Sequence, residues 1–206
     1  MSDSPFLIVG LGNPGAKYAQ NRHNVGFMVA DLLTSQVGAA VGGDPSKAWK
    51  RNSRVRAHVC QGRIPPTGVS SSTVLLAKPM TYMNLSGQVA GPLAVYYKIP
   101  NERVIAIHDE LDLPYGVVRL KSGGGEGGHN GLKSLTQALG GRDYVRVRVG
   151  IGRPPGRMDA ASYVLRDFSR DEHAQLPLVV DLAADAAVEV VTSGLSHAQN
   201  KFHALS

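Results

Sequence analysis

The sequence contains a single cysteine and no long run of apolar residues. One cysteine, Cys60, cannot form an intramolecular disulfide, which fits a reducing compartment such as the cytoplasm. Nowhere do ~18 apolar residues follow one another, and the first residues lack the basic start of an export signal. We therefore expect a cytoplasmic protein with no membrane partner, in which Cys60 is a small residue buried in a strand.

A dinucleotide-binding site is also missing, although residues 10–15 (GLGNPG) have the G-x-G-x-x-G spacing. That fingerprint requires a helix directly after the turn and an acidic residue at the end of the next strand. Here Pro14 and the polar stretch 16–24 delay the helix, and Asp31 falls inside it. The motif therefore does not indicate nicotinamide binding.

Three other catalytic signatures are absent. The glycine-rich segment 123–128 lacks the Lys-Ser/Thr ending of a phosphate loop, although its backbone could still cradle an anion. His108, Asp109 and His129 could together form a metal site, but the sequence has no HExxH motif and no paired-cysteine spacing to support one. No serine lies in a GxSxG elbow. We expect no metal, no cofactor and no covalent nucleophile.

The positive charge lies in one part of the chain. Residues 1–158 carry 19 Lys/Arg and 9 Asp/Glu, a net charge of +10, whereas residues 159–206 carry 3 and 7, a net charge of −4. This distribution favours a polyanionic partner bound over one face, and ordinary solubility charge is the alternative.

Hydrophobic patterning predicts strands that alternate with helices. The expected strands are 6–9, 55–61, 73–77, 104–107, 117–121 and 144–151. The expected helices are 25–37, 86–97, 131–139 and 171–192. Together they predict one α/β domain, residues 1–206, with a mostly parallel sheet covered on both faces.

Some local features carry further expectations. Asn24 is placed to cap the helix at 25–37, and Ser86 to begin the next one. In segment 144–151 the valines share one face, and Arg146 and Arg148 would offer cations on the other. Residues 62–72 read as a flexible loop.

Amide and imidazole side chains gather in four glycine-rich segments that follow apolar runs. These segments are 10–23, 78–87, 108–112 and 123–131. Because active sites of open α/β sheets lie at strand ends, we expect the four segments to meet there.

The residues in these segments suggest a hydrolytic reaction. His23 lies near a helix start, where a neutral imidazole able to accept a proton is favoured. Asp109 follows a strand, and its carboxylate can fix the tautomer of that imidazole. The nucleophile would then be a water deprotonated by His23. The remaining polar groups, which can orient a carbonyl or stabilise an oxyanion, are Asn13, Asn84 and Asn130.

The chain resembles bacterial peptidyl-tRNA hydrolase nearly from end to end. The motifs that carry the resemblance are GLGNPG, Tyr18, RHNVG, KPMTYMNLSG, HDELDLPYG, GGGEGGHNGLKS, VRVGIGRPPG, YVLRDF and Asn200. The resemblance implies a monomeric three-layer α/β/α sandwich around a twisted, mixed sheet, which cleaves peptide from the tRNA 3′ end without metal or cofactor.

The resemblance also assigns roles to single residues. His23 matches the catalytic base, Asp109 its supporting carboxylate, and Asn13 the residue that helps to distinguish blocked from free aminoacyl groups. The matched substrate contacts at the 3′ end are Tyr18, Tyr82, Met83, Asn84 and Asn130. From charge and placement, the candidate contacts to tRNA phosphates are Arg119, Lys121, Lys133, Arg146 and Arg148. The segment 62–72 is longer than is typical of the family.

Two alternatives belong to other classes. A non-catalytic RNA-binding relative of this fold, such as the plant organellar splicing factors that resemble the hydrolase, is disfavoured by the intact pair His23 and Asp109. A carbohydrate- or nucleoside-processing hydrolase is disfavoured because only one carboxylate in the four segments is well placed, and glycosidases normally need two.

Overall fold

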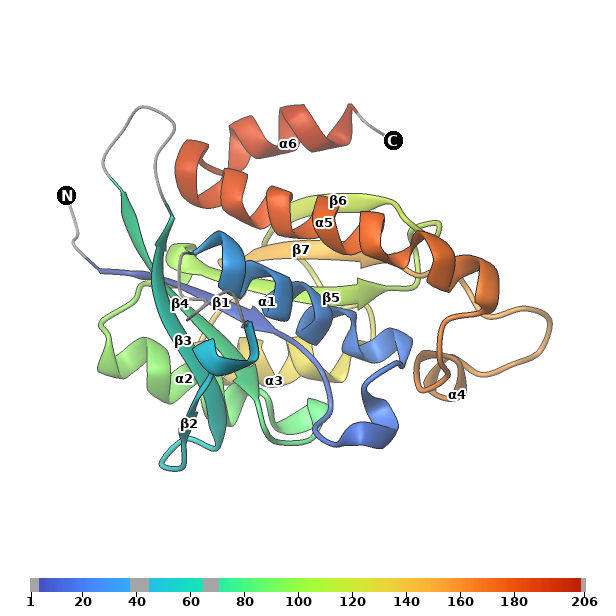
Figure 1. The fold of residues 1–206 in the computed structure, drawn as a ribbon, viewed down its shortest axis with the longest axis horizontal. Helices are drawn as coiled ribbons and strands as arrows, with labels where there is room; N and C mark the ends of the chain where they lie inside the picture. Colours follow the sequence, from blue (N-terminus) through green and yellow to red (C-terminus); the bar gives the residue numbers. More distant parts are fainter. Residues whose placement is uncertain (1–3, 38–44, 65–70, 205–206) are drawn as a thin grey trace.

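The structure of the protein, a computed structural model, describes residues 4–37, 45–64 and 71–204. Within these ranges seven strands form one twisted sheet in the order β2-β3-β4-β1-β5-β7-β6, with helices on both faces (Figure 1). The strands are β1 (Phe6–Gly10), β2 (Lys50–Asn52), β3 (Ala57–Ile64), β4 (Ser72–Pro79), β5 (Val104–Glu110), β6 (Val118–Ser122) and β7 (Val145–Gly150). The α-helices are α1 (Val25–Gln36), α2 (Gly87–Tyr96), α3 (Asn130–Leu139), α4 (Ala160–Val164), α5 (Arg170–Ser193) and α6 (Leu195–His203). Short 3-10 turns are η1 (Ala16–Tyr18), η2 (Arg22–Asn24), η3 (Pro45–Ala48), η4 (Met83–Leu85) and η5 (Asn101–Arg103).

The sheet is mixed, as the family resemblance implies. The pairs β1–β4, β1–β5 and β5–β7 are parallel, whereas β2–β3, β3–β4 and β6–β7 are antiparallel. The expectation of a mostly parallel sheet was therefore too strong. No helix separates β2, β3 and β4 in the described chain, and such direct connections favour antiparallel pairing.

Different helices cover the two faces, which confirms the α/β/α layering (Figure 1). Ile8 and its neighbours on one face join a core with residues of α1 and α5. Leu7 and Val9 point the other way and pack in a second core with residues of α2 and α3. This division follows from the alternation of side chains along a strand.

Glycines bring α1 close to the central strands. A Cβ atom at Gly10 would collide with the backbone of Gly26 on α1, and one at Gly26 would collide with the carbonyl oxygen of Ile107 on β5. The glycines of the GLGNPG and RHNVG motifs thus allow close packing. They hold the start of α1, and His23 just before it, against the ends of β1 and β5.

Several element boundaries were predicted correctly. The expected helix 131–139 is α3, which ends at Gly140 in a left-handed conformation with φ of 68°. Gly194 likewise follows α5.

Cys60 is buried in the middle of β3. Among the described helices, none combines the length and the apolar composition that a membrane crossing requires.

Other boundaries were wrong. β3 begins at Ala57 because residues 53–56 form a turn, and it continues through Ile64 into the expected loop 62–72, of which 65–70 lie outside the described residues. The helix expected to start at Ser86 has Ser86 at its N-cap position, without a capping bond from the side chain. The hydroxyl of Ser86 donates to the carbonyl oxygen of Met83, and the helix begins one residue later and continues through Pro92.

Candidate active site

The four polar segments meet at a cavity of about 530 Å³. Each contributes to its lining, and α4 forms a further wall. The lining residues are Asn13, His23, Tyr82, Met83, Asn84, His108, Asp109, Glu110, Leu111, Glu126, Gly127, Gly128, His129, Asn130, Ala160, Ala161, Val164 and Leu165. The polar motifs did not predict the α4 wall, because the residues of this wall that line the cavity are apolar and lie far from those motifs in the sequence.

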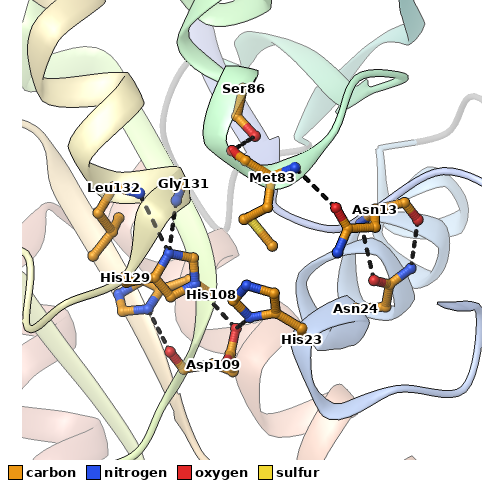
Figure 2. A network of polar contacts seen from close by, with 10 residues as sticks. All are labelled: Asn13, His23, Asn24, Met83, Ser86, His108, Asp109, His129, Gly131 and Leu132. Carbon is orange, nitrogen blue, oxygen red and sulfur yellow. Dashed lines mark hydrogen bonds and ion pairs between the residues drawn. The ribbon is translucent and has the colours of Figure 1, made fainter. Parts of the chain in front are cut away.

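His23 and Asp109 form a hydrogen-bonded pair (Figure 2). Nδ1 of His23 lies 2.8 Å from Oδ1 of Asp109, and both side chains are largely buried. Because an ionised carboxylate only accepts, Nδ1 carries the proton, and Nε2 has a lone pair for a substrate or water. Asp109 is not beyond the strand end, as expected, but within β5, because β5 pairs with β7 as far as Glu110.

The same carboxylate oxygen binds a second histidine. Nε2 of His129 lies 3.0 Å from Oδ1 of Asp109, and Nδ1 of His129 accepts from the backbone N–H groups of Gly131 and Leu132 at the start of α3. These contacts fix His129 as the Nε2–H tautomer. Sequence reasoning missed this partner, although the GGHNG segment before a helix was the available signal.

The electrostatics of the pair differ from the expectation for His23. Burial alone would lower the pKa of His23, but the charge and hydrogen bond of Asp109 outweigh it and raise this pKa above its usual value. Burial would raise the pKa of the Asp109 carboxyl, but the charges and hydrogen bonds of His23 and His129 hold it well below its usual range. The carboxylate, and not the helix start, therefore sets the protonation of His23.

His108 is fully buried beside this pair. Burial, followed by the nearby His129, lowers the pKa of His108 to about 3. Its Nδ1 lies 2.7 Å from the carbonyl oxygen of Asp109, to which it donates. His108 thus stays neutral at physiological pH and does not compete with His23 for the carboxylate charge.

Asn13 is held in one orientation by the backbone and by Asn24 (Figure 2). Its Oδ1 accepts from the N–H of Met83 at 2.8 Å. The Asn24 side chain accepts from the N–H of Asn13 and donates to its carbonyl oxygen, both at 2.9 Å, and does not cap α1 as expected. The Nδ2 group of Asn13 is therefore left as a donor at the cavity.

The predicted substrate contacts occupy different positions. Met83 is buried, whereas Tyr82 is 60% exposed at the rim. Asn84 and Asn130 are exposed and line the cavity. Tyr18 lies in η1, outside the set of residues that line the cavity.

The predicted phosphate contacts divide into two groups. Lys121 and Lys133 are exposed. Arg119 donates to the carbonyl oxygen of His203, and Arg148 pairs with Glu110 at 3.0 Å. The prediction for Arg146 was wrong.

The guanidinium of Arg146 is buried and donates to the carbonyl oxygens of Gly124 and Gly125 at 3.0 and 2.6 Å. Both faces of the sheet are covered, so alternation along β7 did not expose this side chain. Arg146 instead holds the glycine-rich loop that leads to His129.

Arg22 ties the segment before α1 to the segment between α4 and α5. Its guanidinium donates to the carbonyl oxygen of Asp167 at 2.7 Å, pairs with Glu172 at 2.5 Å and lies over the ring of Tyr163. Because Arg22 precedes His23, these contacts link the position of the imidazole to the α4 wall.

Replacing Arg22 by Met should therefore reduce the free energy of unfolding by ~3 kcal/mol, because Glu172 loses the partner of a mostly buried ion pair. Denaturant unfolding measures this loss, with Arg170→Met on exposed helix surface as the control. Equal stability of the two variants would contradict the role of Arg22.

The histidine pair with Asp109 is also a candidate set of metal donors. One ligand atom from each of His23, Asp109 and His129 lies within 4.8 Å of the others. In the described geometry, however, the histidine nitrogens that face Asp109 donate hydrogen bonds to its carboxylate. A metal bound by the two nitrogens that face the carboxylate would have to replace both protons.

Fold and site together define a class of protein. An imidazole with an available Nε2, a buried carboxylate behind it and neutral amides around the cavity are the parts of an α/β enzyme that hydrolyses its substrate. The chain belongs to the peptidyl-tRNA hydrolase family, whose sequence model matches residues 7–206.

Individual relatives are similar over nearly their whole length. The peptidyl-tRNA hydrolase of Streptomyces avermitilis is 54% identical over 202 residues, 98% of this chain and 95% of that protein. The one from Mycolicibacterium smegmatis is 50% identical over 200 residues, 97% and 98% of the two chains. A crystal structure of the Acinetobacter baumannii peptidyl-tRNA hydrolase superposes with a TM-score of 0.83 at 37% identity, covering 99% of this chain and 96% of the other.

Proposed function

We propose that His23 activates the water with which this enzyme hydrolyses the ester bond between peptide and tRNA in peptidyl-tRNA. The observation that carries the proposal is the 2.8 Å hydrogen bond from Nδ1 of His23 to Asp109, which leaves Nε2 as a base at the cavity. In addition, none of the described residues that line the cavity is Ser, Thr, Cys or Lys, so water is the nucleophile at hand.

The reaction then proceeds in two proton transfers. Nε2 of His23 takes a proton as the water oxygen bonds to the ester carbonyl carbon, and the carbonyl oxygen becomes an oxyanion. Nδ2 of Asn13 and the exposed amide groups of Asn84 and Asn130 are available to bind this oxyanion or the neighbouring peptide carbonyl. The ester C–O bond breaks as the imidazolium returns its proton to the 3′ oxygen of tRNA. The products are free tRNA and the peptide carboxylic acid, which loses its remaining proton to solvent at neutral pH.

Substrate binding uses residues that line the cavity and residues outside its lining. Tyr18, Tyr82, Met83, Asn84 and Asn130 contact the 3′ end, and Arg119, Lys121, Lys133 and Arg148 contact phosphates. Exposure of the two lysines and the partly exposed ion pair of Arg148 support this assignment.

Further properties belong to the same proposal. The reaction uses no metal and no cofactor, so a chelator should leave the rate unchanged. The enzyme acts as a monomer in the cytoplasm, and residues 1–206 form one domain. The single sheet that contains all described strands supports the last assignment.

The enzyme should hydrolyse N-acetyl-aminoacyl-tRNA and largely spare free aminoacyl-tRNA. A free α-amino group is largely an ammonium, and the neutral amide of Asn13 offers it no counter-charge. Asn13→Asp should therefore narrow the ratio of kcat/KM for the two substrates while lowering the overall rate. Release assays on both substrates measure this ratio.

An unchanged ratio in Asn13→Asp would remove Asn13 from the discriminating role. If the wild type bound tRNA but released no acyl group, the non-catalytic RNA-binding alternative would replace the proposed function.

A further inference from the structure

A long part of the chain contains basic residues and no acidic ones. Residues 45–101 hold eight Lys/Arg, and no Asp or Glu occurs between Asp44 and Glu102. Five of the eight precede His58, on η3, β2 and the turn to β3. The segment formed by η3 and the β2–β3 hairpin therefore concentrates positive charge. It is separate from the phosphate contacts proposed above.

Three residues that can carry positive charge form a row across neighbouring strands. Arg51 on β2 pairs in register with His58 on β3, and His58 pairs with Lys78 on β4. Side chains directly opposite one another share a face of the sheet, and like charges placed so are destabilising. Asp31 forms an ion pair with Lys78, whereas Arg51 has no such partner among the described residues.

Two cations near the active-site cavity are paired with carboxylates, Arg148 with Glu110 and Arg142 with Glu126. By contrast, within the described ranges no carboxylate pairs with Arg51, Arg54 or Arg56, although Arg56 donates to the amide oxygen of Gln88. Unpaired surface cations raise the local potential and attract polyanions.

A second cavity of about 310 Å³ lies along this hairpin. Its lining includes Arg51, Asn52, Arg56, His58 and Met80, a set called here the basic groove. None of the described lining residues is acidic. The composition suits an anionic group bound by guanidinium donors.

The basic groove adjoins the active site through one short loop. Met80 lines the groove and bonds to the carbonyl oxygen of Arg56 through its N–H at 2.8 Å, while Tyr82, Met83 and Asn84 line the active-site cavity. Three residues of chain span at most ~11 Å. The start of β3 and the end of β4 are neighbours in the sheet, since Ala57 pairs with Pro79. The β2–β3 hairpin and the loop after β4 therefore lie at the same end of these strands, at the bottom of the view in Figure 1.

We propose that the basic groove binds backbone phosphates of the substrate tRNA. These phosphates belong to nucleotides that precede the 3′ end, which occupies the active site. The inference rests on the proposed function, because it takes the polyanion to be the tRNA whose ester is cleaved. Contacts to phosphates fix the position of a nucleic acid without reading its sequence.

His58 gives the groove a spectroscopic reporter. Burial, then the charges of Lys78 and Arg51, lower the pKa of His58, and Asp31 opposes them weakly. A bound phosphate would stabilise the imidazolium. Adding deacylated tRNA should therefore raise the pKa of His58 measured by NMR.

The main test is the double variant Arg51→Gln/Arg56→Gln, compared with Arg63→Gln/Lys98→Gln. The control removes the same charge from the same acid-free segment, but Arg63 lies at the opposite end of β3 and Lys98 follows the far end of α2. Loss of the two contacts should weaken tRNA binding about tenfold at low salt and reduce the slope of log affinity against log salt by ~1 to 2. The control pair should leave both quantities near those of the wild type.

Three measurements on each protein separate the outcomes. Fluorescence anisotropy with deacylated tRNA measures binding without hydrolysis, so the groove is tested even if the proposed function fails. The kcat/KM should fall for N-acetyl-aminoacyl-tRNA but not for an N-acetyl-aminoacyl ester of adenosine. Equal thermal midpoints verify folding. Binding equal to that of the control pair, or an equal loss of kcat/KM on both substrates, would overturn the proposal.

Discussion

The variant His23→Ala should lose at least ~10²-fold in kcat, because neither of the other two histidines described at the cavity is placed to take the proton of the attacking water. His129 cannot replace it, since its Nδ1 accepts from the start of α3 and its Nε2 donates to Asp109. His108 cannot replace it either, because burial keeps its pKa near 3 and its Nδ1 faces a backbone carbonyl. Single-turnover hydrolysis of N-acetyl-aminoacyl-tRNA measures the loss.

The control for this variant is His197→Ala on α6, whose side chain is 65% exposed. Binding of deacylated tRNA should be almost unchanged in both variants, because the imidazole of His23 is not a phosphate contact. Turnover of His23→Ala within a few-fold of the control would show that another group activates the water.

The variant Asp109→Asn should cost ~10²-fold or more in kcat through the loss of charge. Both histidines donate to Oδ1, so an amide oxygen in the same place would keep both hydrogen bonds and the tautomers. In this geometry asparagine would therefore not impose the wrong tautomer. What the variant removes is the negative charge that stabilises the imidazolium of His23.

The pH profile distinguishes this explanation from a structural one. In the wild type the rate should fall as the pH drops through the raised pKa of His23, because a protonated imidazole cannot act as a base. Without the carboxylate charge this pKa falls, so the acidic limb of kcat/KM should move to lower pH, on a lower plateau. A limb that stays in place would contradict the electrostatic role of Asp109.

The two variants should also be coupled. Adding Asp109→Asn to His23→Ala should bring little further loss of kcat, because the carboxylate acts only through the imidazole. Multiplicative losses in the double variant would mean that Asp109 has a second, independent function.

Local sequence patterns predicted most elements and the place of the site. Alternating or helical spacing marked the strands and helices, and glycine turns after apolar runs indicated which ends of the strands carry polar groups. Strand ends were less predictable, as β5 shows. Its last residues resemble a polar turn, and only pairing with β7 extends the strand to Glu110.

The sequence by itself determined the fold class, the close packing of α1 through Gly10 and Gly26, and the four polar segments that meet at the cavity. The pair of His23 and Asp109 was expected, but only the tertiary structure showed that His129 shares the same carboxylate oxygen. The shared oxygen of Asp109 joins groups 86 and 20 residues away in the chain, and no local spacing encodes such contacts. Neighbouring strands likewise determine the burial of Arg146 and the row formed by Arg51, His58 and Lys78. The register of adjacent strands decides which side chains meet, whatever their separation in the sequence.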